Sequence, residues 1–157
     1  MFYHGCVIDA RKGKPYHPAV IAARNFTQSL GLNKGCNMMI LLVHKSKSSK
    51  PEGSSSSINL DHVMATMRVV KQALGDESMV NKKGQPITIT ITAMYKAQVA
   101  LYKKHIEKLC PQDFKHHITV RTVDVRQGYE DDFIILDMVH GYGVGFTRQN
   151  CLTVALT

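Results

Sequence analysis

Residues 118–139 read ITVRTVDVRQGYEDDFIILDMV, two apolar runs separated by a polar stretch. The first run, Ile118 to Val123, is rich in β-branched residues and predicts a strand. Asp124 to Asp132 is polar around Gly128 and predicts a turn. The second run, Phe133 to Val139 (FIILDMV), is apolar apart from one carboxylate, which is typical of a buried strand.

A helix, a strand and a second helix are predicted upstream of this stretch. The apolar positions of the first helix recur at three- and four-residue spacing: Leu60, Val63, Met64, Met67, Val70 and Leu74. Gly75 follows as its expected C-cap. Ile87 to Thr92 (ITITIT) alternates apolar and polar residues, the pattern of a strand with two different faces. The second helix, which ends before Pro111, has one apolar face: Val99, Tyr102, Ile106 and Leu109.

The chain before the first of these helices is harder to interpret. His17 to Leu30 is weakly helical in pattern, and Met38 to Val43 (MMILLV) is a short apolar run that predicts a buried strand. Residues 45–57 (KSKSSKPEGSSSS) have no apolar face and predict a flexible Ser/Lys-rich loop. This divides the chain into an entry segment (1–44), the loop, and a main body (58–157).

Strands that alternate with helices of this length predict an α/β fold, a three-layer structure with a mainly parallel sheet and helices on both faces. The 157 residues suffice for one domain. The net charge of +8 favours a polyanionic partner such as RNA or DNA, or an acidic protein surface, but a basic protein without any such partner is also compatible with it.

The composition sets further limits. The four cysteines form no CxxC pair, so zinc-ligand spacing is absent. The longest apolar run, Met38 to Val43, is too short to span a bilayer, and no secretory signal pattern follows Met1. We therefore expect no membrane partner and a cytoplasmic or nuclear location.

Three blocks of sequence occur in an order and at separations found in one known family. The blocks are ITAMYKAQ (Ile91 to Gln98), TVDVRQGYEDDFIIL (Thr122 to Leu136), and GF followed by LTVALT (Gly145, Phe146, Leu152 to Thr157). Together they resemble ITPYxxQ, TVDxxQGxExDxVIL and GF…RLNVALTRA of the C-terminal motor lobe of superfamily 1 helicases related to the nonsense-mediated-decay RNA helicase. FYHG near the start and SSIN before the first helix are similar to two further stretches of that family.

The resemblance implies the second RecA-like helicase lobe, which has a P-loop NTPase fold without the P-loop. In this lobe Glu130 would contact the nucleotide ribose, and Gln127 and Gly128 would shape the turn that couples the nucleotide to the nucleic-acid grip. A carboxylate can accept hydrogen bonds from ribose hydroxyls, and glycine allows close backbone approach. The alternative is that residues 130–132 (EDD) form only a solvated acidic turn.

The resemblance also implies contacts to nucleic acid, through residues at the ends of the first two strands of the main body. The candidates are Tyr95, Lys96, Gln98, Thr122 and Arg126. An aromatic ring can stack on a base, and a lysine can neutralise a phosphate. The alternative is that Tyr95 packs at the sheet edge and Lys96 is ordinary helix surface.

Parts of the family's machinery are missing from this sequence. No GxxxxGK[ST] motif occurs, so we expect ATP with Mg²⁺ to be held only if a separate first RecA-like lobe is supplied. The family's last block continues with an arginine after VALT, whereas this sequence ends at Thr157, and Met94 replaces a usual proline. We therefore assign no catalytic residue, and we interpret the His116 and His117 pair as surface histidines rather than metal ligands.

The predicted function is that of the C-terminal lobe of an ATP-dependent RNA or DNA helicase, incomplete as a motor. Its expected partners are single-stranded RNA or DNA, and a separate helicase lobe or an RNA-decay factor. One alternative is a noncatalytic basic module that binds RNA or a protein partner. Others are a nonfunctional helicase fragment and an unrelated nucleotide-utilising α/β enzyme, although the latter would need a phosphate-binding loop that the sequence lacks.

Overall fold

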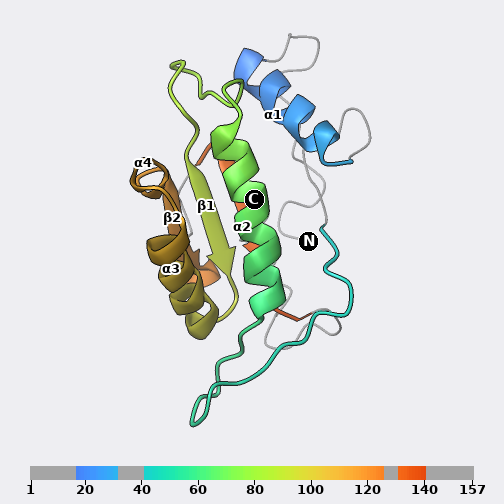
Figure 1. Cartoon of the computed structure of the whole chain (residues 1–157), viewed down its shortest axis with the longest axis vertical. Coiled ribbons are helices and arrows are strands. Elements are labelled where there is room, and N and C mark those ends of the chain that lie inside the picture. Colours follow the sequence, from blue (N-terminus) through green and yellow to red (C-terminus); the bar gives the residue numbers. More distant parts are fainter. Residues whose placement is uncertain (1–16, 32–40, 126–130, 141–157) are drawn as a thin grey trace, which may run out of the picture.

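The structure, a computed structural model, describes residues 17–31, 41–125 and 131–140 (Figure 1). Its helices and strands are α1 (Pro18–Ser29), α2 (Leu60–Gly75), β1 (Ile89–Ala93), α3 (Lys96–Leu109), α4 (Gln112–Lys115), β2 (Ile118–Thr122), the 3₁₀ helix η1 (Val123–Val125) and β3 (Phe133–Asp137). From α2 to β3, the order of the strands and of the two long helices is the one predicted from the sequence, whereas α4 and η1 were not predicted.

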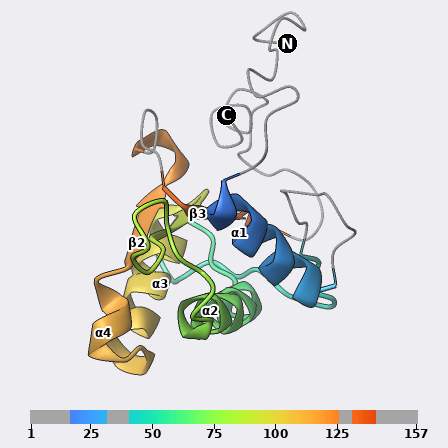
Figure 2. The same cartoon turned by 90° about the horizontal axis from the view of Figure 1, so that it is seen from above.

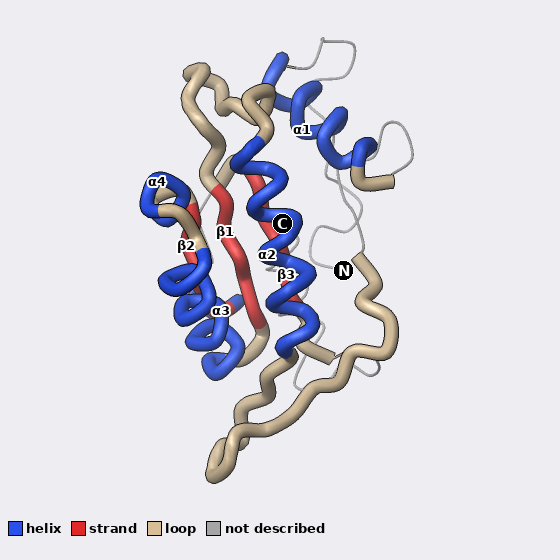
Figure 3. Tube along the Cα trace, viewed as in Figure 1, coloured by secondary structure: helices blue, strands red, loops and turns tan. Residues whose placement is uncertain are grey.

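The three strands form a parallel sheet in the order β2-β1-β3, so β1 is central (Figure 3). In this register Ile89 lies opposite Ile118 on one side and Phe133 on the other. A parallel sheet whose strands are connected by helices confirms the predicted α/β class.

The hydrophobic core lies between the sheet and α2 and α3, which pack on the same side of it (Figure 2). The strands contribute Ile89, Ile91 and Ala93 of β1, all fully buried. The helices contribute the following buried side chains: Phe26 of α1, Val63, Met67, Val70 and Ala73 of α2, and Tyr102 and Ile106 of α3. The sequence predicts a helical layer on each face of the sheet. In the described residues, α2 and α3 form one of these two layers.

The first helix of the core, α2, starts where the sequence provides a cap. The Asn59 side chain accepts a 3.1 Å hydrogen bond from the His62 N–H, and Asp61 in the first turn complements the helix dipole. The prediction for this helix is confirmed, except that Gly75 is its last residue and Asp76, with φ −93°, is the C-cap. Asp76 does not need the left-handed conformation for which a glycine cap was expected.

Two strand predictions need correction. The apolar run Met38 to Val43 was expected to be a buried strand, but Leu41 and Leu42 are in no strand and are 51% and 74% exposed, so this prediction is wrong for residues 41–43. A strand needs a ladder partner, and these residues pair with no described strand. Residues 38–40 lie outside the described part. Separately, β1 begins at Ile89, two residues later than the pattern indicated.

The central strand buries both of its faces. Thr90 and Thr92 point away from the core formed with α2 and α3, yet they are 1% and 0% exposed. Within the described part of the chain, neither hydroxyl has a hydrogen-bond partner. A buried hydroxyl without a partner costs about 1–3 kcal/mol, so the polar face of ITITIT is a source of instability in the sheet.

Thr92 and Thr66 allow this to be tested with a matched pair of variants. Thr66 on α2 lies 3.0 Å from the Tyr102 hydroxyl, so its hydroxyl has a partner. We expect Thr92→Val to leave the free energy of unfolding unchanged or to raise it by about 1 kcal/mol, because valine has the same shape and needs no partner. Thr66→Val should lower it by about 1–2 kcal/mol. Urea denaturation followed by circular dichroism measures both, and a destabilised Thr92→Val variant would contradict the prediction.

Candidate functional site

The candidate site lies at the carboxyl edge of the sheet, where β1 and β3 end and where α2 and α3 begin. In Figure 1 this edge is the lower end of β1, and the chain before α2 runs along it. In open parallel sheets, loops at this edge form the crevice in which ligands bind. The edge holds a network of polar side chains, several of them fully buried.

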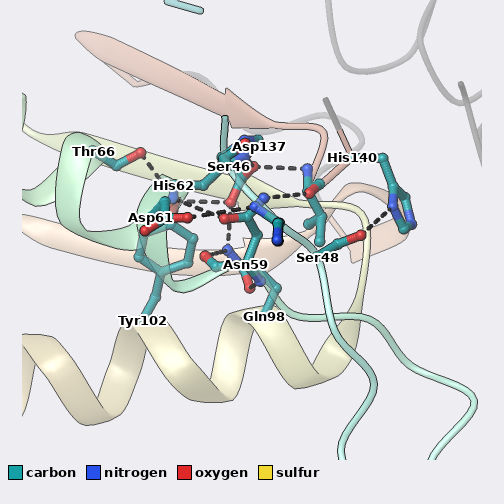
Figure 4. Close-up of polar contacts among 12 residues, drawn as sticks. Ser46, Ser48, Asn59, Asp61, His62, Thr66, Gln98, Tyr102, Asp137 and His140 are labelled. Carbon is teal, nitrogen blue, oxygen red and sulfur yellow. Dashed lines mark hydrogen bonds and ion pairs between the residues drawn. The ribbon is translucent and has the colours of Figure 1, made fainter. Parts of the chain in front are cut away.

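Asp137, the last residue of β3, is the centre of this network (Figure 4). Its Oδ1 lies 2.8 Å from His62 Nδ1 and accepts a 2.8 Å hydrogen bond from the Val139 N–H. Its Oδ2 accepts hydrogen bonds from Gln98 Nε2 at 2.7 Å and from the Tyr102 hydroxyl at 2.9 Å. The carboxylate, which is only 5% exposed, is therefore surrounded by donors from α2, α3 and the chain that follows β3.

These contacts set the charge state of the centre. Burial by itself would raise the pKa of Asp137, but the hydrogen bonds from His62, Val139 and Gln98 and the charge of His62 outweigh it and hold the pKa below its ordinary value. Burial raises the pKa of Tyr102, and the negative charge of Asp137 adds to this. The site therefore contains a carboxylate beside a neutral phenol, and the single phenol proton is donated to that carboxylate.

Asn59 and Gln98 form a second part of the network and join α2 to α3. The backbone N–H of Asn59 donates to Gln98 Oε1 at 2.8 Å, and Gln98 Nε2 donates to the Asn59 carbonyl at 3.0 Å. The Asn59 side chain also donates to the Val139 carbonyl at 2.9 Å. The Gln98 side chain thus gives a partner to the backbone N–H at the start of α2, and the Asn59 side chain gives one to a buried carbonyl after β3.

Val139 has a strained backbone at this point. Its φ is +66°, a conformation that is rare for a β-branched residue and carries strain of about 1–3 kcal/mol. Its N–H and carbonyl are both bonded, to Asp137 and to Asn59, and its side chain is fully buried. The network therefore holds the chain in a sharp change of direction directly after β3, and His140 follows that change of direction.

The Ser/Lys-rich loop contacts this network. Ser46 Oγ lies 3.0 Å from His62 Nε2, so Ser46, His62 and Asp137 are connected in the order of a Ser–His–Asp triad (Figure 4). Acyl transfer by such a triad also needs N–H groups that face the oxyanion. The N–H groups of Ser46 itself and of Lys47 are already bonded, since they donate to the Val43 carbonyl and to Asp61. We therefore interpret this arrangement as an anchor for the loop and not as a nucleophile.

A second contact joins the loop to the start of α3. Ser48 Oγ lies 3.0 Å from His140 Nδ1, and His140 Nε2 lies 3.1 Å from the Tyr95 hydroxyl. The rings of Tyr95 and His140 meet edge to face, with centroids 5.4 Å apart. The predicted flexibility of residues 45–57 stays a prediction, because the structure shows only that the segment has no helix or named strand and contacts the site.

The residues predicted to contact nucleic acid occupy different environments. Tyr95 is the half-buried N-cap of α3 and Lys96, its first residue, is exposed. Gln98 is fully buried, and both ends of its amide group are bonded inside the protein, so it supports the edge from within. Thr122 is half-buried at the end of β2, opposite Ala93. Their contacts with nucleic acid stay predictions.

The residues predicted from the resemblance to bind nucleotide lie outside the described part of the chain. They are Gln127, Gly128 and Glu130, and Arg126 of the nucleic-acid set lies there as well.

Sequence reasoning missed the network itself. Asp137, His62, Asn59 and Tyr102 were not among the predicted site residues. The available signal was a carboxylate inside an otherwise apolar strand, FIILDMV, because a charge is buried only when partners surround it. Nothing in the sequence identified those partners, since His62 and Asp137 are 75 positions apart.

The described residues contain no group of three or more histidine, cysteine or carboxylate side chains that could hold a metal ion. His116 is exposed and His117 is half-buried at the amino end of β2. In the ranges that the structure covers, no helix has the length and apolar character to cross a membrane.

The fold and this edge define an α/β domain that has a parallel sheet and a network of polar side chains at the carboxyl edge of that sheet. A family model described as an AAA domain matches residues 1–157. The chain therefore belongs to this AAA domain family and is a helicase-like, P-loop-related domain. No curated protein matches the sequence.

The lowered pKa of Asp137 predicts how stability depends on pH. A carboxylate with a lowered pKa in the folded state stabilises the fold above its unfolded pKa of about 3.9, and this contribution is lost as the pH falls through the folded value. At pH 7 we expect Asp137→Asn to lower the free energy of unfolding by about 2–4 kcal/mol. Below about pH 4 the difference from the wild type should shrink.

Asp113→Asn, at an exposed position of α4, is the matched control and should follow the wild type at every pH. Urea denaturation between about pH 3 and 7 measures all three proteins, and wild-type and Asp137→Asn curves that run parallel over the whole range would contradict the assignment.

Proposed function

We propose that this domain acts as the second RecA-like lobe of a superfamily 1 helicase motor related to the nonsense-mediated-decay RNA helicase. In this role it contributes contacts to single-stranded RNA or DNA and to the nucleotide, but it is incomplete as a motor. The observation that carries the proposal is the carboxyl edge of the parallel sheet, where Tyr95 and Lys96 follow β1 and where Gln98 of the same helix is bonded to the buried Asp137.

The nucleic-acid contacts rest on the chemistry of that edge. Tyr95 offers an aromatic ring for stacking on a base, and the exposed Lys96 offers a positive charge for a phosphate. Thr122 and Arg126 are the corresponding candidates after β2. A rigid support is an advantage here, because a side chain that is already ordered loses less entropy on binding.

The nucleotide contacts rest on the resemblance to the helicase family. Gln127, Gly128 and Glu130 would meet the nucleotide from this lobe, with Glu130 accepting hydrogen bonds from the ribose. The sequence contains no GxxxxGK[ST] motif to hold the phosphates. ATP with Mg²⁺ would therefore bind only between this domain and a first RecA-like lobe, and a separate helicase lobe or an RNA-decay factor is the proposed protein partner.

A noncatalytic basic module that has kept the fold and binds RNA is the second candidate. The net charge of +8 favours it, since a polyanion would bind such a chain without any nucleotide. The two functions differ in one measurable respect. A motor lobe gains ATPase activity when a first lobe is added, whereas a simple binding module does not.

The proposal predicts salt-dependent binding without ATP turnover. Fluorescence anisotropy of labelled single-stranded RNA and DNA, measured with the purified chain from about 50 to 200 mM salt, should give a log–log slope of about −0.7 for each phosphate contact. An ATPase assay on the same sample should show no turnover.

Tyr95→Ala is expected to weaken binding with little change in that slope, because it removes stacking and not charge. Leu109→Ala, at an exposed position at the other end of α3, is the control for altered packing. Wild-type protein that is folded but binds neither nucleic acid would overturn the proposal, and ATP turnover by the chain alone would overturn the claim that it is incomplete.

A further inference from the structure

Residues 45–50 (KSKSSK), here called the basic segment, consist of three lysines and three serines. Ser46 and Ser48 are bonded to histidines of the domain, at 3.0 Å to His62 and at 3.0 Å to His140. The lysines at positions 45 and 47, on either side of Ser46, are exposed. The serines thus attach the segment to the domain, and the lysine charges remain in solvent.

The backbone reinforces this arrangement. The Lys47 N–H donates to Asp61 Oδ2 at 3.4 Å, and Ser49 exchanges two 2.8 Å backbone hydrogen bonds with Ile58. Lys45 has a φ of +58°, a left-handed conformation that turns the chain as it enters the segment. A lysine-rich stretch that was only solvated would need none of these attachments, whereas a binding surface benefits from order before its ligand arrives.

The attachments hold the basic segment at the same edge as Tyr95. The path runs from Ser48 to His140 (Figure 4). From His140 it continues to the Tyr95 hydroxyl. Ser56 of the same loop accepts a 3.1 Å hydrogen bond from the Ala97 N–H in the first turn of α3. The basic segment and its loop are therefore attached to the start of α3, the helix whose first residue is Lys96.

The charge of this surface favours an anion. Four lysines contribute to it, at positions 45, 47, 50 and 96, and two carboxylates, Glu52 and Asp61, oppose them. Lysine ammonium groups bind phosphate oxygens as point charges, and an aromatic ring at the same edge suits a base. Phosphates repeated along a strand with bases between them match this combination of groups better than a single small anion does.

We propose that the basic segment is a second half of the nucleic-acid site, in which Lys45 and Lys47 bind the phosphate backbone of a single strand whose base stacks at Tyr95. This proposal rests on the proposed function, and it identifies a second surface of the domain that would bind the same strand. Sequence resemblance did not assign the basic segment any role. Its two serine–histidine contacts, Ser46 with His62 and Ser48 with His140, hold it at the carboxyl edge of the sheet.

The test compares two double variants that remove the same charge from opposite ends of the sheet. Lys45→Ala/Lys47→Ala removes two lysines from the basic segment and leaves both serine attachments. Lys82→Ala/Lys83→Ala removes two exposed lysines from the turn before β1, at the upper end of Figure 1. The five-residue strand β1 separates the two ends by roughly 15 Å, more than the Debye length of about 10 Å at 0.1 M salt.

Anisotropy titrations with a labelled single-stranded RNA and DNA give affinity and salt slope for each protein. We expect the first double variant to bind about three- to tenfold more weakly and to lower the magnitude of the salt slope by about 1.4, two contacts at about 0.7 each. The second should stay within about twofold of the wild type and keep its slope.

Each other outcome has a definite meaning. Wild-type binding that both double variants retain, or lose equally, overturns the assignment of the basic segment and leaves the proposed function standing. Absence of wild-type binding overturns both. Poly-glutamate of matched charge, used as a competitor, separates nucleic acid from an acidic protein partner. If it displaces the strand at equal charge concentration, and with the same dependence on Lys45 and Lys47, the site binds acidic polypeptide and the proposal is wrong.

Discussion

The buried carboxylate of Asp137 is the interaction on which the rest of the site depends. A charge this deep in a protein is tolerated only when donors surround it, and here they come from α2 (His62), from α3 (Gln98 and Tyr102) and from the chain after β3 (Val139). Each donor constrains the element that carries it. The carboxylate therefore fixes the relative positions of two helix starts and one strand end, which the apolar core alone would leave less sharply defined.

The same contacts explain why the backbone can be strained at Val139. Its positive φ persists because the surrounding groups determine it from both sides, through Asp137 and through Asn59. The strain has a structural consequence. The chain turns so that His140 meets Tyr95 and Ser48, and two segments that are far apart in sequence are joined at the edge of the sheet.

Hydrophobic periodicity was sufficient to predict the main helices and strands but not the polar site at the edge of the sheet. The spacing of Val63, Met67 and Val70 gave α2, and the ITITIT alternation gave β1, because burial of one face leaves a local pattern in sequence. Asp137 could be recognised in the sequence as a carboxylate in an apolar run. Its partners could not, because tertiary packing brings them to Asp137 and no local sequence pattern identifies them. The MMILLV run shows the opposite failure, since apolar composition predicted a strand where Leu41 and Leu42 are exposed and unpaired with any described strand.

Gln98 shows how the inference from sequence resemblance and the observed structure fit together. The resemblance assigned it to the nucleic-acid side, while the structure buries it completely, with its amide group bonded to Asn59 and Asp137. A residue in this position influences a ligand only through what it holds in place. Because its amide links the starts of α2 and α3, any displacement of Tyr95 at the start of α3 must strain the bonds to Asp137, and through His62 it reaches Ser46 and the loop. The aromatic side chain and the lysines at this edge are therefore supported by one continuous network, which is the property that a surface gripping a flexible strand requires.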